Sequence, residues 1–176
     1  QQRRHLPEFV DLFMQGRLDL ALAWEDRMST VHCERVFETS MEWIGSARGH
    51  APWRLADGEP LPLAAFEGPC VCRSAATEAL DRAGRPWRIA FESPSLSALW
   101  AATAAGLGVS IRTPIGLPAS VRILSTAETG LPALPKLGLA LHRAEETPEP
   151  AVTRLAEIML DELRGASAFP AAAQAA

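Results

Sequence analysis

The apolar positions in the first quarter of the chain change from a helical to an extended spacing. Apolar residues at i, i+3, i+4 and i+7, with Gly16 beyond them, predict a helix over 6–13. Residues 18–24 are apolar nearly throughout, which is typical of a strand covered on both faces. Residues 31–37 and 41–46 predict two further short strands.

Strands then alternate with helices over the rest of the chain. Proline and glycine between 49 and 69 predict a loop, with one helical turn at 63–66. Because alternating elements favour parallel pairing, we expect a mostly parallel sheet. The tail 165–176 is rich in small residues and is predicted to be disordered. The expected elements are strands at 70–72, 87–91, 109–112, 121–124 and 137–142, and helices at 74–83, 95–105 and from about 151 to 163.

Composition narrows the class of protein. With 176 residues and 48% hydrophobic content the chain can bury the core of one domain or two small lobes. Its 17 basic and 21 acidic side chains give a net charge of −4, so we do not expect it to bind DNA by itself. Three cysteines, an odd number, and no apolar leader favour a reducing cytoplasm. Apolar runs stay below the roughly 20 residues that span a bilayer, so no membrane partner is predicted.

Motifs for catalysis or cofactors are missing from the sequence. There is neither a G-x-S-x-G elbow nor a phosphate-binding lysine motif. Gly106-Leu107-Gly108 follows a helix and lacks a third glycine, so we interpret it as a helix stop and a tight entry into a strand. Cys70 and Cys72 would share a face of a strand, but a structural metal site needs four ligands, so buried strand cysteines are predicted. No metal, cofactor or catalytic residue is therefore expected.

The segment Ser93-Pro94-Ser95-Leu96-Ser97 has a positive argument for ligand binding. It leads into a helix directly after a buried strand. Ligands of open α/β sheets collect beyond the carboxyl ends of the strands, and a helix start offers N–H donors to an anion. Ser93 or Ser95 can equally be a simple N-cap, and the two interpretations are compatible.

Several segments, in the right order, resemble the effector domain of LysR-type transcriptional regulators. Gly16-Arg17-Leu18-Asp19-Leu20-Ala21-Leu22 resembles their G-x-L-D-L-A segment. Ser93-Pro94-Ser95-Leu96, followed by Ala104-Ala105-Gly106-Leu107-Gly108-Val109, is similar to their S-x-S-L … A-A-G-L-G-V pattern. Arg73 with residues 79–88 resembles the LrhA/HexA-like subgroup. The likeness covers roughly residues 6 to 164.

The resemblance implies an α/β fold of the type 2 periplasmic-binding-protein kind. Two αβ lobes would be joined by two crossover strands, with a small effector in the cleft. The first lobe would comprise residues 1–68 with 141–164, and the second residues 69–140. The family's first strand, first helix and second strand have no counterpart in this sequence, so the first lobe is expected to be incomplete.

The implied function is effector sensing without catalysis. The domain would regulate DNA binding by a winged helix-turn-helix that this sequence lacks, and it would pair as a homodimer or higher oligomer. A small organic anion is the expected effector, with Arg112 as its partner or, alternatively, as a solvated strand-end arginine. By position, the resemblance assigns effector contacts to Ser93, Pro94, Ser95, Leu96, Trp24, Glu25, Arg112, Thr113 and Pro114.

Two other classes of protein stay open at the level of the sequence. A solute-binding protein of a transporter would share the two-lobed fold, and an upstream leader or helix-turn-helix would decide between them. A small α/β hydrolase or transferase would need an unrecognised nucleophile, which turnover of a substrate would establish.

Overall fold

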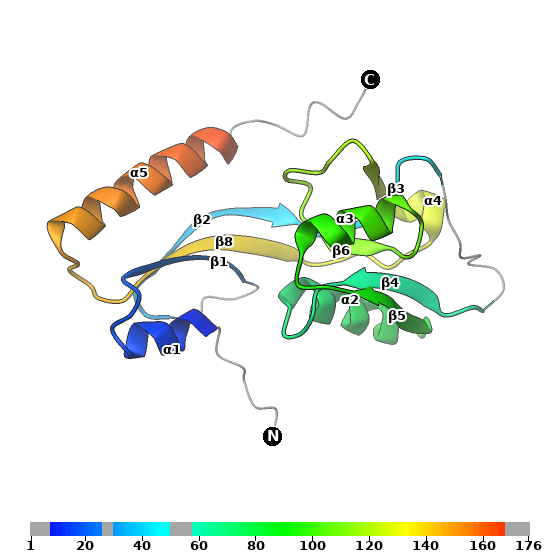
Figure 1. The fold of residues 1–176 in the computed structure, drawn as a ribbon, viewed down its shortest axis with the longest axis horizontal. Coiled ribbons are helices and arrows are strands. Elements are labelled where there is room, and N and C mark those ends of the chain that lie inside the picture. Colours follow the sequence, from blue (N-terminus) through cyan, green and yellow to red (C-terminus); the bar gives the residue numbers. More distant parts are fainter. Residues whose placement is uncertain (1–7, 26–29, 50–57, 168–176) are drawn as a thin grey trace. The chain divides into compact units, whose positions relative to one another are not determined.

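The computed structural model describes residues 8–25, 30–49 and 58–167. The chain forms two compact units. The first unit combines residues 1–38 with 137–176, and the second holds residues 39–136. The chain passes from the first unit to the second at the end of one strand, β2, and returns at the start of another, β8 (Figure 1).

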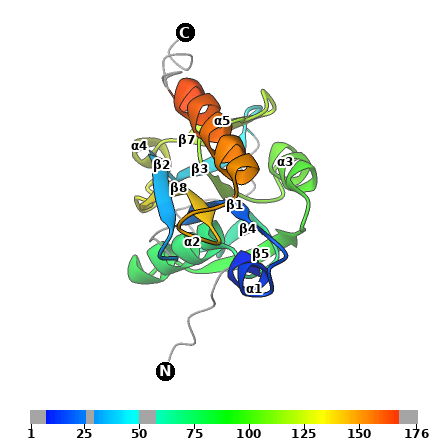
Figure 2. The same ribbon diagram turned by 90° about the vertical axis from the view of Figure 1, so that its left-hand side faces the viewer.

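A three-stranded sheet with the order β1-β8-β2 forms the first unit. β1 and β8 pair antiparallel, so that Leu22 lies opposite Leu141. The amphipathic helix α5 packs Ala156 and Leu160 on Leu141, which places the core of this unit between helix and sheet (Figure 2). The elements are α1 (Glu8–Met14), β1 (Leu20–Glu25), β2 (Cys33–Ser40), β8 (Lys136–Arg143) and α5 (Pro150–Ser167).

Parallel strands and antiparallel strands combine in the second unit. β4 pairs parallel with β5, and a parallel bridge between Leu63 and Val109 adds the β6 segment on the other side of β4. β3 pairs antiparallel with both β6 and β7. The elements are β3 (Glu42–Ser46), β4 (Leu61–Ala65), α2 (Val71–Arg82), β5 (Trp87–Glu92), α3 (Leu96–Ala104), β6 (Ser110–Arg112), β7 (Val121–Leu124) and α4 (Thr126–Thr129).

Helices α2 and α3 lie on opposite sides of β4 (Figure 1), so all five residues of that strand are buried. Leu99 and Ala102 of α3 pack on Ala64. Beneath them, Ser110 donates from its hydroxyl to the Ala64 carbonyl and shares a second hydrogen bond with Thr103, both at 2.8 Å. These buried polar groups are mutually satisfied, which fixes the spacing of α3, β4 and β6.

The interpretation of the glycines after α3 is confirmed. Gly106 ends the helix in the left-handed region, with φ of 78°, where a side chain would be strained. Gly108 then lies directly against the backbone of β4. The pair thus stops a helix and admits a strand.

Two local predictions in the middle of the chain are wrong. Residues 61–65 form β4, where a loop with one helical turn was predicted. The prolines around the apolar run obscured the strand. Pro62 has no N–H to donate, but its carbonyl takes part in the ladder and accepts from the Val109 N–H at 2.8 Å. Cys70 and Cys72 are not strand residues, since Cys70 is the extended N-cap of α2 and Cys72 belongs to that helix.

The larger-scale expectations also need correction. Of the pairings whose direction is given for the described residues, β4 with β5 and the bridge between Leu63 and Val109 are parallel, where helices α2 and α3 connect the strands, and the three other pairings above are antiparallel. Residues 165–167 continue α5, while 168–176 and the start of the predicted first helix lie outside the described residues. The second unit holds residues 39–136, and the predicted lobes, 1–68 with 141–164 and 69–140, stay a prediction.

Candidate functional site

The carboxyl ends of the three parallel strands of the second unit meet at one edge. β4 is followed there by Phe66, β5 by Ser93 and β6 by Thr113. The Ser93 N–H donates to the Ala65 carbonyl (3.3 Å), and the Arg112 guanidinium carbon lies 4.0 Å from the centroid of the Phe66 ring. Two of the residues predicted from the sequence, Ser93 and Arg112, therefore flank the end of β4.

Serine side chains shape the start of helix α3 at this edge. Ser95 is the N-cap, and its hydroxyl accepts from the Ala98 N–H at 3.4 Å. Ser93 supports this turn, because its hydroxyl accepts from the Ser95 N–H at 3.1 Å. Pro94, Ser95 and Leu96 are exposed. The first-turn amides that have no partner inside the helix are donors available to an anion, so capping and ligand binding are compatible here.

Two arginines lie at the same edge, and they differ in whether a carboxylate neutralises their charge. Arg73 forms an ion pair with Glu92 and also donates to the Phe66 carbonyl. Arg112 is stacked on Phe66, and no carboxylate in the described part of the chain lies within ion-pair distance of it. Glu42, opposite Arg112 in the sheet, instead accepts from the Ser40 hydroxyl at 2.5 Å. Arg112 thus carries a positive charge held in place by an aromatic ring.

The spacing of the strands limits what can bind at this edge. Because β4 lies between β5 and β6, the ends of those two strands are separated by about 10 Å, two strand spacings. A single carboxylate can contact the α3 start or the end of β6, whereas a molecule of several carbon atoms can reach both. Thr113 and Pro114, which follow Arg112, are half-buried and line the β6 side.

The two residues predicted in the first unit have partners within that unit. The Trp24 ring packs edge-on against Phe37, with centroids 5.8 Å apart. Glu25 is buried, and its Oε1 lies 3.4 Å from Nε2 of the fully buried His142. Thr30 lies 2.8 Å from Nδ1 of the same ring. Burial lowers the pKa of His142, and the negative charge of Glu25 opposes that shift.

Sequence reasoning missed this buried histidine. The pairing of β1 with β8 puts Glu25 opposite Gly138 and His142 opposite Ala21, and the Glu25 and His142 side chains meet only in the folded chain. The one available signal was a polar residue at the end of an otherwise apolar predicted strand, 137–142. Residues 26–29, which follow Glu25, lie outside the described residues.

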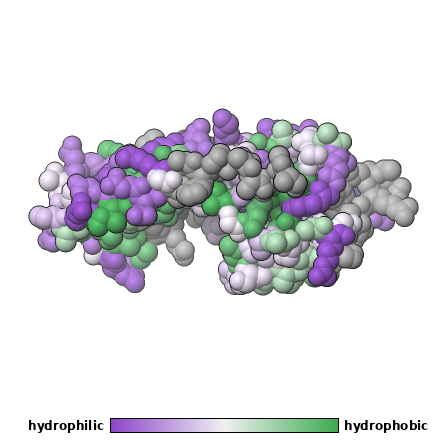
Figure 3. Space-filling view, turned by 90° about the horizontal axis from the view of Figure 1, so that it is seen from above, coloured by the Kyte–Doolittle hydropathy of each residue, from purple (hydrophilic) through white to green (hydrophobic). Residues whose placement is uncertain are grey.

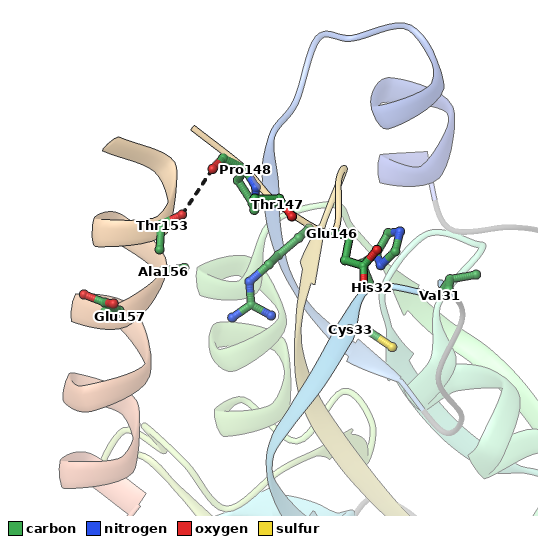
Figure 4. A pocket seen from close by; sticks show the side chains of 10 residues that line it. Val31, His32, Cys33, Glu146, Thr147, Pro148, Thr153, Ala156 and Glu157 are labelled. Atoms are coloured by element: carbon green, nitrogen blue, oxygen red, sulfur yellow. Dashed lines mark hydrogen bonds between the residues drawn. The ribbon is translucent and has the colours of Figure 1, made fainter. Parts of the chain in front are cut away.

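A hollow of about 480 Å³ in the first unit was also not predicted. It lies between the start of β2, the segment after β8 and helix α5, where Thr153 donates to the Pro148 carbonyl (Figure 4). Its arginine, Arg143, is already paired with Glu34 at 3.2 Å. The residues lining it are Val31, His32, Cys33, Arg143, Glu146, Thr147, Pro148, Thr153, Ala156 and Glu157.

Among the described residues, no group of three or more His, Cys, Asp or Glu side chains could hold a metal ion. None of the helices in the described ranges is long and apolar enough to cross a membrane. In the space-filling view, apolar residues form small groups among hydrophilic ones (Figure 3), and the exposed Leu155 and Ile158 belong to α5. The strand-end edge of the second unit is therefore the best candidate site.

Comparison with known proteins connects this edge to a family. The family model described as the LysR substrate binding domain matches residues 3–164. The chain belongs to this family. The LysR domain is 33% identical over 129 residues to the HTH-type transcriptional regulator PecT of Dickeya dadantii (strain 3937), covering 73% of this chain and 39% of PecT. It is 35% identical over 115 residues to the HTH-type transcriptional regulator DgdR of Burkholderia cepacia, covering 65% of this chain and 37% of DgdR.

A solved structure supports the same fold. The bromide-bound regulatory domain of HypT from Salmonella typhimurium matches with a TM-score of 0.68 and 17% identity, covering 90% of this chain and 78% of that one. The fold is thus the type 2 periplasmic-binding-protein-like α/β fold of LysR regulatory domains, as predicted. The family prediction is confirmed, and the transporter alternative is not favoured. Assignment to the LrhA/HexA-like subgroup stays a prediction.

Proposed function

We propose that the LysR domain senses a small organic anion at the strand-end edge of its second unit. Ser93, Pro94, Ser95 and Leu96 would contact the ligand at the start of α3, and Arg112, Thr113 and Pro114 would contact it after β6. The observation that carries the proposal is that a serine-capped helix start and an arginine stacked on Phe66 flank the same strand end. Hydrogen bonds from a guanidinium to a carboxylate are charge-assisted and stronger than neutral ones.

The assignment of Trp24 and Glu25 as effector contacts, made from the resemblance, stays a prediction. Within the first unit, Trp24 is half-buried against Phe37, and the Glu25 carboxylate faces His142.

The role in the whole protein is also a proposal, because the chain spans only 39% and 37% of the lengths of PecT and DgdR. Ligand binding would regulate a winged helix-turn-helix that contacts DNA in the cytoplasm, and the domain would catalyse nothing. The regulator would act as a homodimer or higher oligomer. The names of both relatives as HTH-type transcriptional regulators support this role.

The anion site is tested with Ser95→Glu. A thermal-shift screen of small mono- and dicarboxylic acids identifies a stabilising acid, and calorimetric titration then measures its affinity. The introduced carboxylate would occupy the place of the ligand's negative charge. We therefore expect the affinity for the acid to fall at least about tenfold, which is a loss of about 1.4 kcal/mol of binding free energy.

Ser125→Glu is the matched control. Ser125 is an exposed N-cap of α4 whose hydroxyl accepts from the Glu128 N–H at 3.1 Å, so both variants lose a cap. We expect the control to bind the acid like the wild type. Unchanged affinity in Ser95→Glu, or an equal loss in both variants, would contradict the site.

Sedimentation velocity tests the proposed partners. Because the net charge of −4 repels phosphates, we expect this chain not to co-sediment with duplex DNA at physiological salt. Specific retention of DNA by the chain would contradict this expectation.

Sedimentation velocity also measures the assembly state. Alone at micromolar concentration, the chain is expected to sediment as a dimer or larger species. A clean monomer would contradict this expectation.

A further inference from the structure

Strand β1 forms one edge of the sheet in the first unit. The order of the sheet is β1-β8-β2, and in the described part of the chain no strand pairs with the outer side of β1. The apolar run at 18–24 predicts a strand covered on both faces, yet Leu22 in the middle of β1 is 40% exposed. An apolar strand at the edge of a sheet is a template for pairing with another strand.

Hydrogen bonds at the start of β1 fix the direction of its backbone groups. The Asp19 carbonyl, just before β1, accepts from the Ala144 N–H at 2.9 Å. The Arg143 N–H, opposite Leu20, donates away from β1 to the His32 carbonyl at 2.8 Å. Asp19 is thus bonded to the β8 side and Leu20 is not, and these two arrangements alternate along an antiparallel ladder.

The alternation directs the backbone N–H and carbonyl of every second residue of β1 toward the outer edge. These residues are Leu20, Leu22 and Trp24. The intervening Ala21 and Ala23 bond to β8 instead. The side chain of Leu22 lies on the same face of the sheet as that of Leu20, which packs on the core beneath α5. The outer edge therefore offers donors and acceptors beside an exposed apolar side chain.

The two edges of this sheet differ in charge. β2 carries Glu34, Arg35 and Glu38, and charged side chains on an edge strand oppose its pairing with another chain. Residues 20–24 of β1 carry no charge, and the Glu25 side chain at its end is buried. Of the two edges, β1 is therefore the one that admits a second copy of itself without bringing like charges together.

We propose that the outer edge of β1 pairs antiparallel with β1 of a second copy of the chain, which joins two three-stranded sheets into one. A two-fold axis at Leu22 would place Leu22 opposite the partner's Leu22 and Leu20 opposite the partner's Trp24. Each pair matches outward donors with outward acceptors, so the edge is complementary to itself. The inference rests on the proposed assembly as a homodimer or higher oligomer, and it names the interface.

The size of the edge sets the expected strength of the pairing. β1 has six residues. Such a strand is about 20 Å long, and a sheet is about 10 Å thick. The contact is therefore smaller than the roughly 800 Å² per partner that is usual in a stable complex. Backbone hydrogen bonds supply the affinity of such strand addition, so we expect a monomer–dimer equilibrium with a dissociation constant in the micromolar range.

Amide hydrogen exchange, read residue by residue in the wild-type chain, tests the pairing directly. The concentration is raised from below to above the dissociation constant. Exchange at Leu22 and at its outward neighbours Leu20 and Trp24 should slow at least about tenfold, because the second copy covers these amides. Exchange at Ala21 and Ala23 should change less, because these amides bond to β8 in both states.

Two results of the exchange experiment would overturn the proposal. Slow exchange of the outward amides at every concentration would mean that another part of the chain covers the edge. Outward amides that still exchange fast in a dimer would place the interface on another surface.

A charge at the centre of the edge tests the same pairing in solution. Leu22→Lys would put two like charges opposite each other, so we expect the dissociation constant from sedimentation velocity to rise at least about tenfold. Leu155→Lys is the matched control, because Leu155 is a leucine of α5 in the same unit that is 52% exposed. The control should dimerise like the wild type, and circular dichroism shows whether both variants are folded.

The failure of the interface and the failure of the assembly are distinguishable. A dimer of unchanged strength in Leu22→Lys, or equal weakening in both variants, would refute the β1 interface and leave the assembly standing. A wild-type chain that stays monomeric well above micromolar concentration would refute both.

Discussion

Gly108→Ala is expected to lower the free energy of unfolding of the second unit by roughly 3 kcal/mol, at the upper end of the cost of overpacking. A methyl group at this position would lie 2.9 Å from the Ala64 nitrogen and the Pro62 oxygen, and 3.0 Å from the Leu63 carbonyl carbon. All three atoms belong to the backbone of β4, so no side chain can rotate away to make room. The clash can be relieved only by moving β4 and β6 apart.

That movement would break specific hydrogen bonds. The Val109 N–H donates to the Pro62 carbonyl at 2.8 Å, and the Ala64 N–H donates to the Val109 carbonyl at 3.0 Å. Since Phe66 follows β4 and Arg112 is the last residue of β6, the strand-end edge would lose its geometry as well. Urea denaturation followed by circular dichroism measures the loss of stability.

Gly165→Ala is the matched control for this substitution. Gly165 lies in α5, with no atom within 4 Å of an added methyl group. The change there is expected to be neutral or to stabilise the helix by about 0.5–1 kcal/mol, because alanine has the higher helix propensity. If Gly108→Ala lowered the free energy of unfolding no more than Gly165→Ala does, β4 would not confine position 108.

The second large effect is a loss of stability at acidic pH, which we expect the buried His142 to cause. Burial lowers the pKa of this imidazole, and Glu25 at 3.4 Å opposes the shift. The unfolded chain takes up the proton near its ordinary pKa of about 6.5, whereas the folded chain does so only at lower pH. Between these two pKa values the unfolded state therefore binds more protons than the folded state. The free energy of unfolding decreases as the pH is lowered through this range.

The expected slope is up to about 1.4 kcal/mol per pH unit below about pH 6.5. Urea unfolding between about pH 7.5 and about pH 5 measures it. His142→Gln removes the titrating group but keeps a polar side chain facing Thr30, so its slope should be smaller. An identical slope in the wild type and this variant would show that His142 does not carry the acid sensitivity.

Glu25→Gln tests whether the Glu25 carboxylate opposes the lowering of the pKa of His142 by burial. A neutral amide leaves burial unopposed, which lowers the pKa of His142 further and extends the loss of stability to lower pH. If the loss ended at a higher pH in this variant, the Glu25 carboxylate would not be the group that favours the protonated imidazole.

The sequence by itself determined the features whose physical cause is local. Helical spacing and the glycine beyond it identified α1, and the apolar run before Glu25 identified β1. The serine N-cap and Gly106 marked both ends of α3, because capping and left-handed backbone depend on a few neighbouring residues. The order of the motifs then identified the LysR family, which the family match confirmed.

Only the tertiary structure decided which distant groups meet. Pairing of β1 with β8 buries Glu25 against His142, and the bridge from β4 to Val109 brings Arg112 over Phe66. Residues 61–65 are a strand because two helices cover them, although the prolines around them favour a loop. These contacts depend on burial between segments far apart in the chain, and such burial outweighs the local preference of a short segment.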